Sequence, residues 1–320
     1  LAVLERACRA LELPPDRVAL PRPRRALGRE AVTGQFLSAN DKSALEVNDE
    51  ERLKEFEFRW RGAGGGFRKL RAFNDLMRDP VANKYAGDFV RGKIRATVKD
   101  PVKAEILCPK PDLPFGTKRL CVDTHYYETF NRDNVALVTE GITGIVPEGV
   151  RTADGVLHAI DILICATGFK VFESGNMPPF QVTGSQGRDL ESWWDAERYQ
   201  AYEGVSMPGF PNFFLILGPN GYNGASYFQL IEQQVRHITR CLKQARTRKA
   251  RRVEVTREAN DRYFRDMKAR SGSQVFFNNG CASANSYYFD KHGDVPFRPA
   301  TSLEAHWRSM TFDLNDYVYR

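Results

Sequence analysis

Two adjacent cations, Lys118 and Arg119, stand on a Gly-Thr turn within the stretch PFGTKRL. Such a pair can contact a phosphate or stabilise an oxyanion, because ammonium and guanidinium groups form charge-assisted hydrogen bonds with anions. An exposed cation pair without a ligand is the common alternative. The residue types alone leave both interpretations open.

A glycine turn follows an apolar run in the stretch DILICATGF, residues 161–169. The apolar run predicts a buried strand, and the strand ends in the small residues Ala166, Thr167 and Gly168, followed by Phe169. Gly168 has no Cβ and can adopt a positive φ, which permits close approach of another group. Ligands of α/β folds bind at the carboxyl ends of strands, so we expect a cofactor here. A tight turn in an ordinary core is the alternative.

A second junction of this kind is FFLILGPNG, where an apolar strand over 213–217 runs into Gly218, Pro219 and Asn220. A helix is predicted to begin near Ser226, and helix N-termini receive phosphates or carboxylates. Two strand-to-glycine junctions indicate a shared nucleotide or flavin. The helix carries one apolar stripe, formed by Tyr227, Ile231, Val235, Ile238 and Leu242.

The other elements follow from hydrophobic period and from breaking residues. Residues 49–98 are predicted to be helical. One helix is expected over 67–77, with Phe67, Leu70, Phe73 and Leu76 on one face, and we expect it to end at Asp79-Pro80. A further helix is expected to end at Asp100-Pro101. Residues 134–165 predict strands with a hairpin turn at Asp154-Gly155, residues 251–256 a strand, and residues 257–270 a helix. The glycine cluster at 62–66 lacks both a preceding buried strand and a final glycine, so we interpret it as a connection between helices. The pattern as a whole predicts an α/β fold.

Composition excludes several classes of protein. The 320 residues contain six cysteines with no CxxC pair and five histidines without ligand spacing, so we predict no metal site. Scattered cysteines favour a reducing, cytoplasmic location. The sequence contains no apolar run long enough for a membrane span. The net charge of +7 lies largely in local basic runs that we interpret as a solvated surface, with no nucleic-acid partner.

Five stretches together carry a family resemblance. They are PFGTKR…YYETFNRDNVALV, GVRTADG…DILICATGF, SMPGFPNFFLILGPNG, IEQQVRHI and YYFDKHGDVPFRP, and they occur in the order that the family has. The chain resembles the class B flavin-dependent monooxygenases over roughly residues 46–320, and most of all their Baeyer–Villiger branch. Ser286-Tyr287-Tyr288 departs from the Ser-Trp-Tyr of the family, and a tyrosine at 287 can still stack and donate a hydrogen bond.

The resemblance implies an incomplete α/β, two-dinucleotide-binding-domain flavoprotein architecture with a helical insertion, and FAD and NADPH as cofactors. It implies that Arg119 is catalytic beside the flavin, where it stabilises an anionic flavin peroxide. It implies that Lys118 contacts the NADPH phosphate region. The remaining cofactor-binding residues would be Ala166, Thr167, Gly168, Phe169, Gly218, Pro219, Asn220 and Tyr287.

The implied reaction inserts one oxygen atom from O2 next to a ketone carbonyl, giving an ester or a lactone. Two alternatives remain at this point: a flavin monooxygenase that oxidises the nitrogen or sulfur of an amine or sulfide, and a non-catalytic remnant. Disulfide-reducing flavoproteins are disfavoured because they need a close cysteine pair.

The expected organisation has four parts. Residues 1–45 are unassigned, 46–115 form a helical subdomain, 116–165 the C-terminal part of an NADP-binding domain, and 166–320 the C-terminal part of an FAD-binding domain. Neither glycine motif of the family, GxGxxG for FAD or its counterpart for NADP, occurs in this sequence. We therefore expect the back part of a longer protein, with weak flavin binding by itself.

Overall fold

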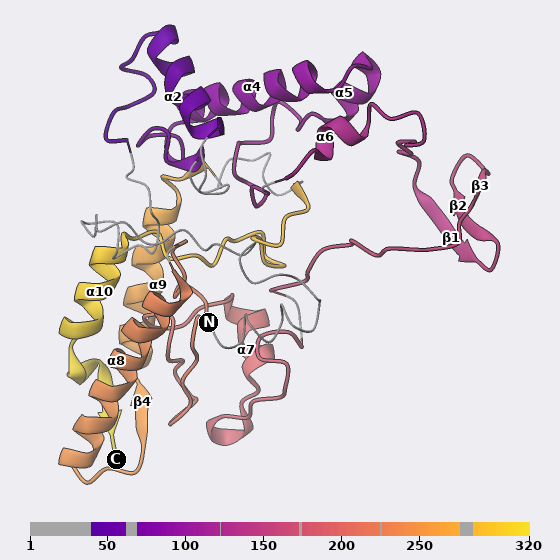
Figure 1. The fold of residues 1–320 in the computed structure, drawn as a ribbon. Coiled ribbons are helices and arrows are strands. Elements are labelled where there is room, and N and C mark those ends of the chain that lie inside the picture. The colour runs from indigo at the N-terminus through magenta and orange to yellow at the C-terminus, as the bar shows by residue number, and fades with distance from the viewer. Residues whose placement is uncertain (1–39, 62–68, 122, 173–174, 225, 276–283) are drawn as a thin grey trace, which may run out of the picture.

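The computed structural model describes residues 40–61, 69–121, 123–172, 175–224, 226–275 and 284–320. Figure 1 shows a helical part along the top, a small antiparallel sheet at the right, and a larger part below in which α8, α9 and α10 run together. Most of the unassigned N-terminal segment and the glycine cluster at 62–66 lie outside the described residues. No helix among the described ranges is long and apolar enough to cross a membrane.

The helical part contains the helices α2 (Asp49–Arg61), α4 (Pro80–Thr97), α5 (Pro101–Leu107) and α6 (Tyr126–Thr129). The two Asp-Pro pairs begin helices rather than ending them, so that expectation was wrong. Asp79 accepts hydrogen bonds from the amides of Val81 and Ala82, and Asp100 caps α5 in the same way. Proline suits the first helical position because the N–H it lacks has no partner there.

The helix expected over 67–77 is not continuous in the described residues: 69–70 are helical, and 71–78 are turns and bends. Residues 67–68 lie outside the described residues. The backbone and side chains of 71–78 bond to the preceding segment instead. Asp75 accepts from the Ser43 hydroxyl and the Ala44 amide, and the Asn74 amide donates to the Lys42 carbonyl. The apolar positions were nevertheless predicted correctly, because Phe73 and Leu76 are buried with Phe56, Ala82 and Ala86.

The small sheet consists of β1 (Ile142–Val146), β2 (Gly149–Thr152) and β3 (Leu157–Ala159), all antiparallel. The predicted hairpin turn at Asp154-Gly155 joins β2 to β3, and Gly155 has a φ of 85° there. Positive φ is the reason that the turn takes glycine.

The segment 161–169 departs most from expectation. It is neither buried nor part of a sheet: the exposed fractions of Ile162, Ile164 and Phe169 are 79%, 84% and 80%. No backbone hydrogen bond joins it to any described residue. Figure 1 shows it running alone from β3 toward the larger part. The described sheets have three and two strands, none longer than five residues, so none of them can cover it.

The larger part contains α7 (Leu190–Glu197), α8 (Tyr227–Thr247), β4 (Val253–Val255), α9 (Arg257–Ser271), α10 (Ser302–Thr311) and β5 (Tyr317–Tyr319), with short 3₁₀ turns at Ser185–Gly187 and Leu314–Asp316. β4 pairs antiparallel with β5. The predicted strand over 251–256 and helix over 257–270 are confirmed. One core joins α8, β4, α9 and β5 and includes Cys241, Val255, Tyr263, Met267 and Tyr317. Leu190, Trp193 and Trp194 of α7 belong to a second core.

The apolar stripe of α8 is largely exposed, although such a stripe is expected to face the core. Tyr227, Val235 and Leu242 are 55%, 47% and 51% exposed. The helix buries a neighbouring face, formed by Leu230, Gln233, Gln234, His237, Cys241 and Ala245. Polar residues are tolerated on that face because they are bonded: Gln234 accepts from the Leu217 amide at 2.7 Å.

The strand expected over 213–217 is not regular. The φ of Leu217 is 58°, a left-handed conformation that a strand cannot contain. The Leu215 amide donates to the Val205 carbonyl, which holds this segment against the chain around Glu203.

A buried carboxylate joins three segments of the larger part. Glu203 is 3% exposed, and it accepts hydrogen bonds from Arg298 at 2.5 Å and from Arg308 at 2.7 Å. Both guanidinium groups also lie near the Tyr263 ring. A buried charge is tolerated only when it is paired and hydrogen-bonded, so these contacts depend on one another.

We predict that Glu203→Gln lowers the free energy of unfolding by about 3 kcal/mol or more, because Arg298 stays buried without a counter-charge. Urea denaturation of the 320-residue chain measures this. Glu105→Ala, which breaks an exposed pair with Arg95, should leave the midpoint nearly unchanged. Equal midpoints for both variants would contradict the role given to Glu203.

A buried histidine lies between α8 and the C-terminal strand. His237 is 1% exposed, stacks on the Phe312 ring at 3.7 Å, and is 2.7 Å from the Tyr317 hydroxyl through its Nε2. Burial, together with the nearby cations Arg240 and Arg298, lowers the pKa of His237 to about 3.

This shift predicts a loss of stability in acid. The unfolded chain binds a proton at His237 near pH 6.5, while the folded chain does so only near pH 3, so the contribution is present above 6.5 and is lost as the pH falls between these values. Within this range the free energy of unfolding falls by about 1.4 kcal/mol for each unit by which the pH falls. His237→Gln should flatten urea midpoints between pH 6 and 4, and an unchanged slope would show that other groups cause it.

Candidate functional site

The Arg119 side chain lies in a cluster of tyrosines. Its guanidinium forms a hydrogen bond with the phenol of Tyr288, and the phenols of Tyr287 and Tyr222 stand nearby. Partial burial by itself would lower the pKa of Arg119, but the hydrogen bond to Tyr288 and the surrounding phenols raise it above the usual value. Burial raises the pKa of both Tyr222 and Tyr288. The guanidinium is therefore a permanent positive charge, held by neutral phenols.

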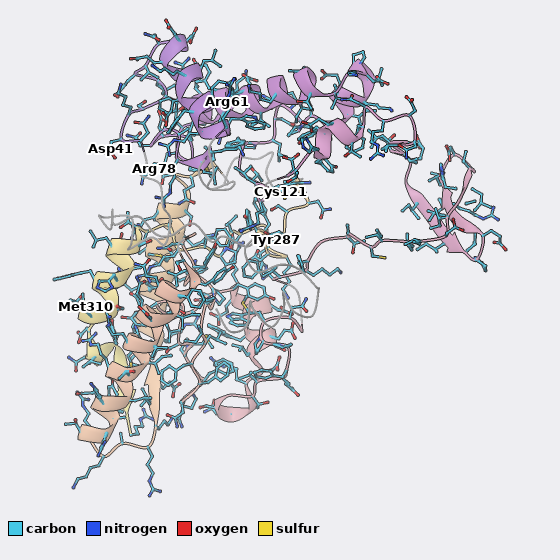
Figure 2. The ribbon with its side chains drawn as sticks, viewed as in Figure 1. Asp41, Arg61, Arg78, Cys121, Tyr287 and Met310 are labelled. Carbon is cyan, nitrogen blue, oxygen red and sulfur yellow. The ribbon has the colours of Figure 1, made fainter. Side chains whose placement is uncertain are left out.

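The turn that carries Arg119 is fastened to the segment that carries the tyrosines. Ser286 donates from its hydroxyl to the Thr117 carbonyl at 2.8 Å, across 169 positions of sequence, and Thr117 is fully buried. Figure 2 shows Tyr287 between the helical part above and the α8–α10 part below. The ring of Phe297 closes the cluster, 5.1 Å from Tyr288 and 5.2 Å from Tyr222.

The residues of the first glycine junction approach this cluster only at its end. The Phe169 ring lies 6.5 Å from that of Tyr287. Ala166, Thr167 and Gly168 are exposed. Gly168 has a φ of 89°, and a Cβ built on it would meet nothing within 4 Å. The structure therefore shows a left-handed turn here with open space around it.

The second glycine junction is packed by the chain itself. A Cβ on Gly218 would meet the Gly204 carbonyl oxygen at 2.7 Å, and a Cβ on Gly204 would meet the Gly221 Cα at 2.1 Å. Two backbone segments thus touch directly, which explains the glycines without a ligand. Pro219 is buried in the same turn. This contact leads directly to Tyr222, whose carbonyl accepts from the Arg298 amide.

One buried polar atom in that turn is unsatisfied. The Asn220 amide group donates to the Phe297 carbonyl, but its Oδ1 is buried without a hydrogen-bond partner among the described residues. The φ of Asn220 is 59°, and the Tyr263 hydroxyl fixes its carbonyl at 2.8 Å. Buried polar atoms in folded proteins are normally bonded, so this acceptor marks a place for a donor from a ligand or water.

Lys118 is exposed, and within the described part of the chain it has no ion-pair partner. The structure thus brings together Arg119, Phe169, Tyr287 and the 218–222 turn, with Arg119 and Phe169 still exposed. Lys118, Ala166, Thr167 and Gly168 are exposed without such contacts.

Sequence reasoning missed Tyr222 and Phe297 and treated Tyr288 only as part of a departing motif. Tyr222 had a local signal, since it stands two residues after Asn220 in the same turn. Phe297 had none, because its place beside Tyr222 depends on a contact across about 75 residues of sequence.

Comparison with known proteins assigns the chain to a family. No family model matches the chain. It is 39% identical over 241 residues to the phenazine N-monooxygenase of Lysobacter antibioticus, covering 73% of the chain and 43% of that protein. It is 36% identical over 267 residues to a Baeyer-Villiger monooxygenase of Pseudooceanicola batsensis, covering 80% and 48%. It also superposes on a crystal structure of OTEMO in complex with FAD and NADP with a TM-score of 0.79 and 32% identity, covering 88% and 52%.

The chain belongs to the Baeyer–Villiger monooxygenase family. It spans about half the length of the relatives it matches. The expected two-dinucleotide-binding-domain flavoprotein architecture is confirmed by the likeness in structure. The proposed domain boundaries stay predictions. The exposure of segment 161–169 then has an explanation in the family architecture: the described residues contain only part of its sheets.

Two glycines near the cluster should respond differently to an added methyl group. Gly204→Ala should destabilise the chain by about 3 kcal/mol or more, because its Cβ overlaps the Gly221 backbone in a left-handed conformation. Gly168→Ala should cost about 1–2 kcal/mol at most, from its positive φ alone. Urea denaturation of both variants tests this, and similar losses would contradict the packing described.

Proposed function

We propose that the protein is an FAD- and NADPH-dependent monooxygenase that inserts one oxygen atom from O2 next to a ketone carbonyl and yields an ester or a lactone. The observation that carries the proposal is Arg119, a permanently charged guanidinium held by Tyr288 and lying beside Tyr222 in a chain of this family. Relatives bound to FAD and NADP support the choice of cofactors.

The residues present fit the planar end of a flavin or a nicotinamide. Aromatic rings at Phe169 and Tyr287 can stack on a flat ring. The unsatisfied Asn220 Oδ1 can accept a hydrogen bond from a ring N–H. The open space around Gly168 leaves the backbone accessible. Bound there, the flavin would supply the reduction of O2 and the transfer of one oxygen atom.

Arg119 would stabilise the negative charge that develops beside it during oxygen transfer, because a guanidinium does not lose its proton. The Tyr288 phenol orients it and keeps its N–H groups directed toward the cluster. Lys118, exposed and with no ion-pair partner among the described residues, would contact the phosphate of NADPH.

A second reaction class rests on a specific comparison. The phenazine N-monooxygenase of Lysobacter antibioticus is 39% identical to the chain, against 36% for the Baeyer-Villiger monooxygenase of Pseudooceanicola batsensis. Oxidation of an amine or sulfide therefore remains the alternative, and the product decides: an ester from a ketone, or an N- or S-oxide. We place either reaction in the cytoplasm, where the free thiols of Cys108, Cys121, Cys165 and Cys241 would stay reduced.

The test uses the chain fused to the part of the Pseudooceanicola batsensis enzyme that it does not match. The fusion should oxidise NADPH and convert a cyclic ketone to a lactone, measured by absorbance at the nicotinamide band and by mass spectrometry. Arg119→Met should lower kcat about 100- to 1000-fold while the flavin absorbance per protein is unchanged.

The matched control is Arg95→Met, which removes an exposed arginine of α4 that pairs with Glu105. Unchanged kcat for Arg119→Met would overturn the role given to Arg119. N- or S-oxide products without any lactone would favour the second reaction class.

A further inference from the structure

The positive charge of the chain is concentrated in one short segment. Residues 233–253 contain eight arginines and lysines and no aspartate or glutamate: Arg236, Arg240, Lys243, Arg246, Arg248, Lys249, Arg251 and Arg252. The whole sequence has 47 cations and 40 acidic residues, so without these eight the remaining 39 cations are outnumbered by the acids. The protein is therefore not basic throughout. Its excess charge lies on α8 and on the turn that joins α8 to β4.

Five of these cations form a surface that we call the basic end: Lys243, Arg246, Arg248, Lys249 and Arg251. All five are exposed, and none pairs with a carboxylate among the described residues. The carboxylates of the adjoining elements are already paired, Glu254 with Arg252 and Asp316 with Arg262. Within the described part of the chain, the basic end thus keeps its full charge.

The basic end lies at one end of the molecule. Figure 1 shows the C-terminal end of α8, the start of β4 and the C-terminus of the chain together at the bottom, with α2 and α4 at the top. The turn is fixed there, because the amides of Arg251 and Arg252 donate to the Arg320 carbonyl at 2.7 and 2.8 Å. Figure 2 places Tyr287 of the candidate site well above it. A large partner can therefore contact the basic end and leave the candidate site uncovered.

The end of a helix determines how it can attract an anion. A helix C-terminus presents carbonyl groups and a partial negative charge, so the end of α8 cannot hold a single phosphate through backbone N–H groups as a helix N-terminus does. The attraction must come from the long side chains alone, and these reach several separate anions at once. An extended surface of anionic groups fits the basic end better than one small anion.

The adjoining strand β5 indicates which anionic surface fits. Val318 is 36% exposed, and the Arg248 guanidinium lies 4.8 Å from the centre of the Tyr319 ring. Arginine thus already stacks on this ring, whereas proteins that bind single-stranded nucleic acid use open aromatic rings on which bases stack. An apolar side chain and a tyrosine beside a group of cations are typical of contacts with a membrane interface.

We propose that the basic end docks the protein on the surface of a bilayer that contains anionic phospholipids. The cations lie among the headgroups, and each lysine or arginine near such a surface adds to the attraction. The cytoplasmic leaflet carries anionic lipids, which agrees with the location proposed above. Docking of this kind is contact with one face of the bilayer and needs no helix that crosses it. The proposal holds whichever oxygenation the protein catalyses.

The experiment measures cosedimentation of the 320-residue chain with lipid vesicles. One set contains phosphatidylcholine with about 30% phosphatidylserine, and the other contains phosphatidylcholine alone. We expect the chain to bind the anionic vesicles and not the neutral ones. Binding should weaken as the salt concentration rises from about 50 to about 300 mM, because salt screens the attraction between exposed charges.

A triple variant tests whether the basic end carries the binding. Arg246→Gln, Lys249→Gln and Arg251→Gln together remove three of its five cations. Affinity for the anionic vesicles should fall about 100-fold, since each cation contributes about fivefold. The urea midpoint of the variant should stay unchanged because the three side chains are exposed, so that a loss of binding is not a loss of folding.

The matched control removes the same charge elsewhere. Lys54→Gln, Lys110→Gln and Arg132→Gln together change three exposed cations outside the basic end, and this variant should bind like the unchanged chain. Equal losses in the two triple variants would overturn the proposal, because net charge would then govern binding. Equal binding to both kinds of vesicle, or binding to neither, would also overturn it. So would tighter binding to a DNA duplex that the basic-end variant loses, since the partner would then be a nucleic acid.

Discussion

The buried carboxylate of Glu203 is the contact on which the candidate site depends. It holds Arg298 and Arg308, and Arg298 in turn binds the Tyr222 carbonyl through its amide. The next residue, Gly204, contacts Gly221 and so holds the 218–222 turn close to the segment around Glu203. Tyr222 leaves that turn and meets Arg119. One desolvated charge thus fixes, through backbone contacts, the position of a cation that lies about 80 residues away in sequence.

The site combines a rigid side and an open side. The rigid side is the Thr117–Ser286 hydrogen bond with the rings of Tyr222, Tyr288 and Phe297. The open side is the glycine junction at 166–168, where no described atom would obstruct a Cβ at Gly168. Placing the charged group on the rigid side keeps it oriented before any ligand binds, which is the arrangement that electrostatic stabilisation requires.

Predictions from the sequence were correct for elements that neighbouring residues determine. They were wrong for elements whose burial depends on packing against another segment. The hairpin at Asp154-Gly155 and the helix α9 follow from nearby residues, and both were predicted. The Asp-Pro pairs were assigned to the wrong end of their helices, because proline is compatible with a start as well as with a stop. The strand at 161–165 was predicted to be buried because its side chains are apolar, but burial needs a covering element that the described residues do not include. The stripe of α8 was identified correctly as apolar, and it is exposed for the same reason.

The residues of the candidate site that have a local sequence signal were identified from the sequence, and those that depend on distant contacts were not. Arg119 and Tyr287 lie in recognisable stretches, and the 218–220 turn leads to the cluster. Two contacts complete the site, and both join residues that are far apart in sequence. Tyr222 and Phe297 are separated by about 75 positions, and Thr117 and Ser286 by 169. No periodicity in a single sequence encodes such pairs, since they arise from tertiary packing.

The exposed run at 162–165 also has a consequence for handling the protein. An extended apolar stretch with unpaired backbone groups is a template for cross-β aggregation. Asp161 and Lys170 bracket this run with opposite charges, in the position of gatekeeper residues that limit such stacking. Substitution of either residue by an apolar one would lengthen the aggregation-prone segment. The first effect would be lower solubility at high protein concentration, without a change in the fold.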